Sequence, residues 1–407
     1  MVNIIKKHKT TNIVFVLSLC AFLISVLIAI KIDVGTSNLY VYQAEAFLGG
    51  HLDIPEKLPD VATYKDRYYV PFPPFPAMLV LPIKEVFGVV NTTLISLILT
   101  LVSVLAVKDI LKKLNTDETA SPWLLLAFFL GTGYWLAVIG SNGVWFFAHI
   151  VCVTFLLLSI REALGDGRGF LAGLFLGFAF LSRQLSIYSS MFIIAALLAN
   201  HSNTTKKSKV WAMLSFVFAL STCILVYLAF NYFRFGSPFD TGYSYLDLEG
   251  FLALRVKRFG LFSPAYVPFN LIYMFFQGPH LEFGGSVTPQ AMDPFGTSIT
   301  FASPFLFSAF FAKGNKLMRI SAWLAIGLTI THMVFYYNNG WAQANTQRFT
   351  LDFLPVLLVL VALSIESIKK HMSLFYWAIV YSVTLNIITL LLFPLIIKLL
   401  STLREVF

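Results

Sequence analysis

The sequence predicts an all-α polytopic membrane protein, and three features of its composition and patterning lead to this class. Of the 407 residues, 58% are hydrophobic and only 12% are charged, and the mean hydropathy is +0.78. A soluble protein carries about 25% charged residues. Apolar runs of about 20 residues recur along the chain, which is the length that an α-helix needs to cross a bilayer. These runs are continuous and do not alternate with polar residues, which excludes a transmembrane β-barrel.

The apolar runs predict about 11 spans in a single transmembrane domain that covers residues 1–407. The predicted spans are 12–31, 89–107, 122–139, 143–160, 169–182, 186–199, 210–231, 299–312, 320–337, 351–365 and 373–396. Residues 76–87 are too short to cross and are interrupted by proline, so we expect an interfacial or re-entrant helix there. No stretch between the spans is long enough to build a core of its own.

The distribution of charge predicts the orientation of these spans. Three lysines precede the first span, so we expect the N-terminus in the cytoplasm. The predicted inner loops hold about 16 Lys and Arg in short segments, whereas about 14 of the 20 acidic residues lie outside. The net charge of +9 therefore follows from the positive-inside rule, and we expect no nucleic-acid partner.

Two long polar segments are expected on the outer side. Residues 32–88 form the first extracytoplasmic loop, which is rich in acidic residues and ends in a cluster of prolines between Pro71 and Pro82. Proline fixes φ, so this cluster should stiffen the return of the chain into the bilayer. Residues 232–298 form the second outer region, with a basic patch at Arg255, Lys257 and Arg258 and short interfacial helices.

The acidic residues of the first outer loop are candidate general bases toward an acceptor hydroxyl or amine. Asp60 and Asp53 are the preferred pair, because they lie close to the prolines and to tyrosines that include Tyr69, a candidate for substrate binding. Glu45 is a third candidate and falls in a predicted amphipathic helix, YVYQAEAFL. The alternative is that each of these carboxylates is a solvated loop charge or, for Glu45, a helix cap.

Three arginines at the outer ends of spans are candidates for binding phosphate. Arg183, Arg234 and Arg348 each lie where a planar guanidinium group could bind the phosphate of a lipid bidentately. The alternative is that their side chains extend to lipid headgroups. Asp352 follows Arg348 by four residues, so the two side chains should share one side of a helix, where they could bind substrate or form an ion pair.

Neither a nucleotide site nor a metal site is indicated by a sequence motif. A P-loop, a G-x-G-x-x-G motif, an H-E-x-x-H motif and a G-x-S-x-G motif are all absent. No cofactor is indicated by a motif, although carboxylates from distant loops could share a divalent cation, Mg²⁺ or Mn²⁺. His149 and His332, inside predicted spans, are expected to be packed polar residues. Outer aromatic residues such as Tyr243 and Trp341 could stack on a sugar ring or form an interfacial belt.

The segment YYVPFPPFPAMLVLP (68–82), placed after an outer first loop, resembles the matching part of the integral-membrane GT-C glycosyltransferases. That family includes the aminoarabinose transferase and protein O-mannosyltransferase group. The segments 231–245 and 340–355 also resemble stretches found in bacterial members. The resemblance implies transfer of a sugar from a polyprenyl-phosphate carrier, with inversion, at the outer face of a bacterial inner membrane. It further implies a first-loop carboxylate as base and arginines that hold the carrier phosphate.

The sequence departs from the family pattern at two positions that matter for the site. Ser37 and Asn38 stand where better-known members carry an acidic pair, and Pro71 stands where they carry an acid before Pro-Pro. We therefore expect Asp60, Asp53 or Glu45 to take the role of base, with Asn38 as a residue that binds substrate. The alternative is that the chain uses the fold without that chemistry.

The leading hypothesis is an enzyme that moves a sugar from a polyprenyl-phosphate-linked donor to a glycan, lipid or protein of the cell envelope, in contact with membrane lipids. An O-antigen polymerase or ligase is an alternative that the basic patch at residues 255–258 would fit. A transporter of lipid-linked saccharides is another, although it would need ionisable residues within the membrane and the spans are poor in buried charge. A non-catalytic scaffold is the remaining alternative.

Overall fold

The computed structural model describes residues 2–33, 38–200, 205–283, 289–340, 343 and 347–396, and it is mainly helical. The α-helices in these ranges are α1 (Val2–Asp33), α2 (Leu39–Leu48), α3 (Phe75–Phe87), α4 (Thr92–Lys113), α5 (Ser121–Leu130), α6 (Tyr134–Ile139), α7 (Val144–Leu164), α8 (Gly169–Phe180), α9 (Ser190–Asn200), α10 (Lys206–Phe235), α11 (Gly250–Phe259), α12 (Val267–Leu271), α13 (Ile299–Ala302), α14 (Lys316–Phe335), α15 (Leu354–Ser364) and α16 (Met372–Ile387).

Shorter helical turns and two small hairpins complete the described elements. The 3₁₀ turns are η1 (Gln184–Ser189), η2 (Tyr243–Tyr245), η3 (Pro264–Tyr266), η5 (Pro304–Phe311), η6 (Arg348–Asp352) and η7 (Lys369–His371), and the π-helical turns are η4 (Ile272–Phe276) and η8 (Ile388–Leu392). The antiparallel hairpins pair β1 (Ala62–Tyr64) with β2 (Arg67–Tyr69), and β3 (Leu281–Phe283) with β4 (Pro289–Met292).

The structure confirms an all-α polytopic membrane protein. Six helices in the described ranges are long and apolar enough to cross a membrane, namely Ile13–Asp33, Thr92–Lys113, Val144–Leu164, Lys206–Phe235, Lys316–Phe335 and Lys369–Ile396. The other predicted spans coincide with shorter or broken helices, such as α5 and α6, which residues 131–133 separate. The number of spans, about 11, stays a prediction.

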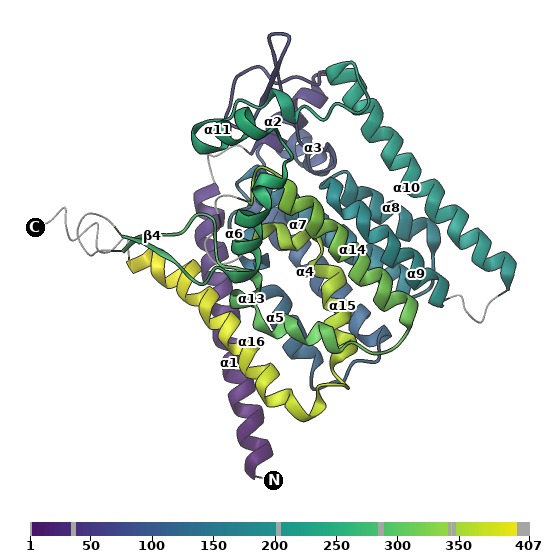
Figure 1. Ribbon diagram of the computed structural model, residues 1–407, viewed down its shortest axis with the longest axis vertical. Coiled ribbons are helices and arrows are strands. Elements are labelled where there is room, and N and C mark those ends of the chain that lie inside the picture. The colour runs from purple at the N-terminus through teal and green to yellow at the C-terminus, as the bar shows by residue number, and fades with distance from the viewer. Residues whose placement is uncertain are drawn as a thin grey trace, which may run out of the picture.

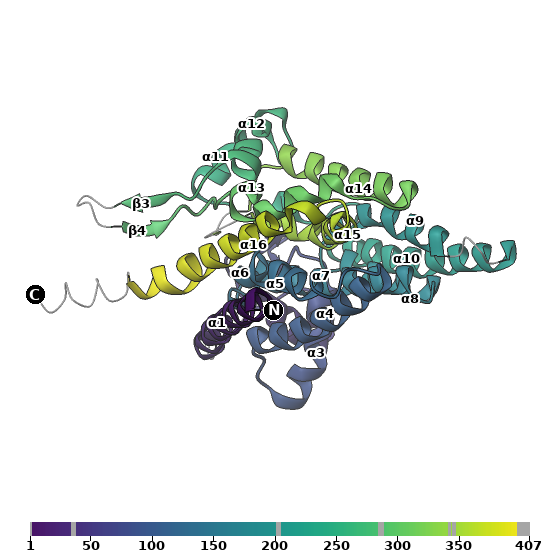
Figure 2. The same cartoon turned by 90° about the horizontal axis from the view of Figure 1, so that it is seen from below.

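Helix α7 lies at the centre of the bundle, and three of the long helices lie at its edges. Of the apolar part of α7, 78% is buried, against 28% for α1 and 33% for both α10 and the last long helix. Figures 1 and 2 show α1 and α16 side by side at one edge, with α10 at the opposite edge. The peripheral helices expose many large aliphatic and aromatic side chains, as helices in contact with lipid do.

Helices α8 and α10 pack with their backbones close together because α8 presents a stripe of glycines. Gly169, Gly173 and Gly177 recur at intervals of four and therefore lie on one face of α8. A Cβ atom at Gly173 would overlap the carbonyl oxygen of Phe216 on α10. Small residues at this spacing let membrane helices approach closely and gain van der Waals contact.

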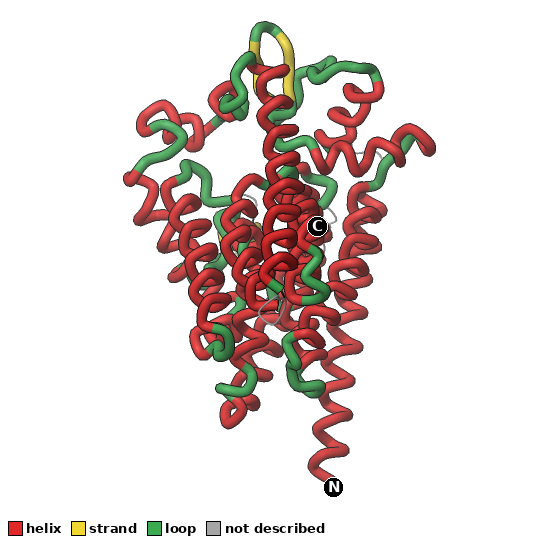
Figure 3. Tube along the Cα trace, turned by 90° about the vertical axis from the view of Figure 1, so that its right-hand side faces the viewer, coloured by secondary structure: helices red, strands yellow, loops and turns green. Residues whose placement is uncertain are grey.

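The predicted outer regions gather at one end of the bundle. Figure 3 shows hairpin β1–β2 and several short helices at the end opposite the N-terminus. The predicted helices around Glu45 and across 76–87 are present as α2 and α3. Hairpin β1–β2 was not predicted; its turn residues Lys65 and Asp66 have φ of 50° and 59°, as a type I′ turn requires.

The close packing of α8 on α10 leads to a prediction about stability. Gly173→Ala should destabilise the protein by about 1–3 kcal/mol, because the added methyl group meets the backbone of Phe216. Gly327→Ala on α14 is the matched control, since a Cβ there meets open space and alanine favours the helix. Thermal unfolding of both variants in detergent measures the difference. Equal midpoints would show that α8 and α10 can move apart at little cost.

Candidate functional site

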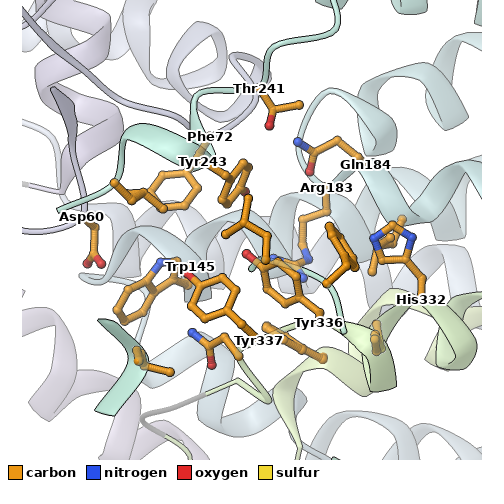
Figure 4. Close-up of a pocket in the computed structure, with 18 of the residues that line it drawn as sticks. Asp60, Phe72, Trp145, Arg183, Gln184, Thr241, Tyr243, His332, Tyr336 and Tyr337 are labelled. Carbon is orange, nitrogen blue, oxygen red and sulfur yellow. The ribbon is translucent and has the colours of Figure 1, made fainter. Parts of the chain in front are cut away.

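One cavity lies at the end of the bundle where the outer segments gather. It has a volume of about 370 Å³ and is lined by residues from five separate parts of the chain. The lining residues are Asp60, Phe72, Trp145, Arg183, Gln184, Leu185, Thr241, Tyr243, Leu246, Leu248, Leu252, Leu261, Phe262, His332, Met333, Tyr336, Tyr337, Asn338, Arg348 and Phe349. Figure 4 shows Asp60 at one side and Arg183 with His332 toward the other, with aromatic rings between them. The cavity therefore joins one carboxylate and two guanidinium groups across an aromatic lining.

Asp60 is held at the cavity by a turn that precedes strand β1. Its φ is +63°, a left-handed conformation that aspartate and asparagine tolerate better than most residues. Burial raises the pKa of Asp60 from 3.8 to about 6, although the positive charge of Arg348 acts in the opposite direction. The carboxylate is thus ionised at neutral pH and more basic than a carboxylate in water.

The first outer loop is fastened to the second outer region next to Asp60. Ala62 forms a β-bridge with Leu246, and the Tyr64 hydroxyl donates to the carbonyl oxygen of Phe235 at 3.1 Å. An ion pair between Lys57 and Asp247 joins the same two regions. These contacts fix the position of Asp60 relative to the cavity wall that residues 241–252 provide.

Arg348, the first residue of η6, is buried beside the cavity with an incomplete set of partners. Its Nε donates to the carbonyl oxygen of Gly340 at 3.3 Å, and Nη1 has no hydrogen-bond partner in the part of the chain that the structure describes. The guanidinium carbon lies 4.7 Å from the ring centre of Trp145. Burial and the charge of Arg183 lower the pKa of Arg348 to about 9. A buried cation with an unused donor is suited to binding an anion.

Arg183 borders the same cavity but is already paired. Its Nε and Nη2 donate to the two carboxylate oxygens of Asp352 at 2.5 and 2.7 Å. The Asp352 side chain is fully buried, and its Oδ1 also lies 3.4 Å from Nδ1 of His149 on α7. The expected i, i+4 pairing of Asp352 with Arg348 is wrong: η6 is a 3₁₀ turn, and the carboxylate turns to Arg183.

The buried group of Arg183, Asp352 and His149 also changes one expectation about the spans. They are not uniformly poor in buried charge, because Asp352, inside the predicted span 351–365, has a fully buried carboxylate that pairs with Arg183. His332 on α14, expected to be a packed polar residue, lines the cavity, and its Nδ1 lies 3.3 Å from the Tyr188 hydroxyl.

Four other predicted site residues do not line the cavity. Oδ1 of Asp53 lies 3.7 Å from Nη1 of Arg67, and Glu45 forms an ion pair with Lys84 of α3. Asn38 caps α2 by accepting from the backbone N–H of Tyr40 at 3.0 Å. The Tyr69 side chain packs against Phe235 with 5.4 Å between the ring centres. Of the three candidate bases, the structure thus brings only Asp60 together with Arg183 and Arg348.

Arg234 is buried in a different place from the other two arginines. Its Nη1 donates to the carbonyl oxygen of Val70 at 2.6 Å, and Nη2 donates to Asn231 at 2.8 Å. The guanidinium carbon lies 3.8 Å from the ring centre of Phe230. The side chain therefore holds the backbone immediately before the proline cluster, and Arg234 is not among the residues that line the cavity.

Several lining residues were not singled out from the sequence. Trp145 is the second residue of α7, and Tyr336, Tyr337 and Asn338 follow the end of α14. Their common signal is an aromatic or amide side chain at the outer end of a predicted span. Tyr243, which was considered for sugar stacking, does line the cavity, whereas Trp341 lies outside the described residues.

Two further expectations concern metal and the basic patch. Within the described ranges, no group of three or more His, Cys, Asp or Glu side chains is arranged to hold a metal ion. A shared Mg²⁺ or Mn²⁺ stays a prediction, with Asp60 as the carboxylate at the cavity.

The basic patch on α11 is not uniformly open: Arg255 donates to the carbonyl oxygen of Tyr337 at 2.9 Å, while Lys257 and Arg258 are exposed.

Comparisons with known proteins give likenesses of structure. No protein-family model matches the sequence, and no curated protein matches it. The structure is similar to that of ArnT from Cupriavidus metallidurans bound to undecaprenyl phosphate, with a TM-score of 0.47 and 14% identity, over 86% of this chain and 60% of that chain. It is also similar to the oligosaccharyltransferase of Archaeoglobus fulgidus in the apo form, with a TM-score of 0.39 and 14% identity, over 91% of this chain and 54% of that chain.

A third similar structure is the oligosaccharyltransferase AglB from Archaeoglobus fulgidus in complex with an inhibitory peptide and a dolichol-phosphate. It has a TM-score of 0.39 and 14% identity, over 88% of this chain and 51% of that chain. The chain thus spans little more than half the length of these proteins.

The contacts of Arg234 predict a structural role that can be separated from ligand binding. Arg234→Met should lower stability by about 1–3 kcal/mol, because it leaves the buried Val70 carbonyl without its donor. Arg258→Met, at an exposed position on α11, is the control and should leave the unfolding midpoint unchanged. Thermal unfolding and titration with undecaprenyl phosphate are measured in parallel. Loss of lipid affinity by Arg234→Met without loss of stability would make Arg234 a phosphate ligand after all.

Proposed function

We propose that the protein transfers a sugar from a polyprenyl-phosphate-linked donor to a hydroxyl or amine of a cell-envelope glycan, lipid or protein. One observation carries this proposal: Asp60, Arg183 and Arg348, far apart in the sequence, border one cavity with an aromatic lining. Such a transfer needs a carboxylate that can accept a proton, a cation that can bind a phosphate, and aromatic rings that can contact a sugar.

Arg348 is the group best suited to the phosphate of the donor. It is buried. Among the described residues, its Nη1 has no hydrogen-bond partner and its guanidinium group has no carboxylate within 4 Å. A guanidinium group binds phosphate oxygens through charge-assisted hydrogen bonds. As the bond between the sugar and the phosphate breaks, negative charge develops on the phosphate, and a fixed cation in a site of low dielectric constant stabilises that charge.

Asp60 is proposed as the base that accepts the proton of the acceptor. A general base works best when its pKa lies near the operating pH, and burial raises the pKa of Asp60 toward that range. The aromatic rings of Trp145, Tyr243 and Tyr337 lie between the two ends of the cavity, where the sugar would be held. The lipid tail of the donor would remain in the bilayer beside the helices.

The side of the membrane and the cell compartment are part of the proposal. The positive-inside rule supports an extracytoplasmic cavity in a bacterial inner membrane, because the loops at the N-terminal end of the bundle carry most of the basic residues. Hairpin β1–β2 lies at the opposite end, and Asp60 comes two residues before β1 (Figure 3). A cysteine introduced at exposed Lys65 should accordingly be labelled by a thiol reagent that does not cross membranes.

The role of Asp60 leads to a prediction about catalysis and pH. Asp60→Asn should lower turnover by about 10²–10⁴-fold, because the amide cannot accept the proton, while asparagine preserves the left-handed backbone. Since burial raises the pKa to about 6, the carboxyl is protonated below that pH, and wild-type activity should rise as the pH increases through about 6. Purified protein with labelled polyprenyl-phosphate sugars provides the assay.

Asp53→Asn is the control for this substitution, because Asp53 lies in the same outer loop but away from the cavity. It should retain full activity. Equal activity of Asp60→Asn and the wild type would remove Asp60 from the mechanism. An activity that does not change between pH 5 and 7 would exclude an ionised Asp60 as the base.

The role of Arg348 leads to a prediction about binding. Arg348→Gln should weaken the binding of undecaprenyl phosphate by about 10- to 100-fold, which corresponds to about 1.5–3 kcal/mol for a hydrogen bond to a charged group. Arg258→Gln, exposed on α11, is the matched control and should bind as the wild type does. Tryptophan fluorescence is a suitable readout because Trp145 contacts Arg348. Unchanged affinity of Arg348→Gln would place the phosphate elsewhere.

A further inference from the structure

The two guanidinium groups at the cavity differ in whether their charge is compensated. Arg183 gives two hydrogen bonds to Asp352, whose side chain has 0% exposure, so this pair adds no net charge to the cavity. Arg348 has no carboxylate within 4 Å among the described residues. Asp352 does not line the cavity; it lies behind Arg183, next to His149. A carboxylate that the substrate does not reach therefore sets how much positive charge the substrate meets.

The charge of the phosphate changes during the proposed reaction, so the net positive charge of the cavity affects how tightly donor and product bind. The bond between the anomeric carbon and the phosphate oxygen breaks, and the oxygen keeps the electron pair. The acceptor oxygen forms the new bond to the anomeric carbon, and its proton passes to Asp60. The donor is a phosphodiester with one negative charge, whereas the product is a phosphomonoester with a charge of about −1.5 to −2 near pH 7.

A cavity with two uncompensated guanidinium groups would favour the product over the donor. Each additional fixed cation interacts more strongly with a dianion than with a monoanion, and the difference is large in a site of low dielectric constant. Product that binds too tightly slows its own release, and product release limits the turnover of many enzymes. Because Asp352 cancels the charge of Arg183, only Arg348 contributes a net positive charge that favours the product, while the guanidinium group of Arg183 stays in place.

We propose that Asp352 is a positioning residue that limits the positive charge of the cavity, so that donor and product phosphates bind with similar affinity and the product is released. This inference rests on the proposed function. Asp352 acts through Arg183: its two hydrogen bonds hold the guanidinium plane against the cavity wall and cancel the charge. His149 on α7 contacts the same carboxylate, with 3.4 Å between its Nδ1 and Oδ1 of Asp352.

The test compares two lipid probes on the full chain in detergent. The probes are undecaprenyl phosphate, which stands for the product, and undecaprenyl methyl phosphate, which carries the single charge of the donor. Wild-type protein should bind the two within a few-fold of each other. Asp352→Asn should bind undecaprenyl phosphate about tenfold or more tightly than the wild type does, with a smaller gain for the methyl ester. Asp352→Glu keeps the charge and should restore the wild-type ratio.

A second variant covers the case in which Asp352→Asn does not fold, since breaking a buried pair leaves an uncompensated charge. Arg183→Gln combined with Asp352→Asn removes both charges and should give the wild-type ratio of affinities. A purely structural role predicts that Asp352→Asn weakens both probes equally, and that result, or a changed ratio in the double variant, would overturn the inference. Failure of the wild type to bind either probe would instead overturn the proposed function.

Discussion

The ion pair between Arg183 and Asp352 is the interaction on which the arrangement of the cavity depends. Removing a guanidinium group and a carboxylate from water costs several kcal/mol for each ion, and only good geometry with further contacts offsets that cost. Here both hydrogen bonds of a bidentate pair are formed, and His149 lies on the other side of the carboxylate. The pair joins the turn after α8 to η6 and to the central helix α7, so three parts of the bundle that carry cavity residues are held together.

The three arginines illustrate that position at the end of a span does not define a role. All three were expected to hold phosphate, and each has a different environment. Arg234 supports the backbone before the prolines, and Arg183 is paired with a carboxylate. Among the described residues, Arg348 has no carboxylate within 4 Å, and its Nη1 has no hydrogen-bond partner. The distinction arises from what surrounds each guanidinium group. In the proposed reaction Arg348 is therefore the arginine that contacts the anion directly.

The helices were largely predictable from the sequence, whereas the partners of the site residues were not. Continuous apolar runs located every long helix, because burial in lipid demands them over a length that sequence shows directly. Hairpin β1–β2 was missed because strands of three residues give almost no periodic signal. Asp60 was chosen for its place near the prolines, and the structure brings it to the cavity. The partner of Asp352 could not be found, since Arg183 lies 169 residues away and only tertiary packing joins them.

The distance along the chain between the cavity residues has a consequence for biosynthesis. During translation Asp60 leaves the ribosome early, Arg183 follows near the middle, and Arg348 emerges only when most helices have entered the bilayer. Asp352 comes later still, so Arg183 spends this interval as a cation without its carboxylate. A nascent chain that stops before η6 would hold the Arg183 guanidinium group without the carboxylate that pairs with it in the complete structure.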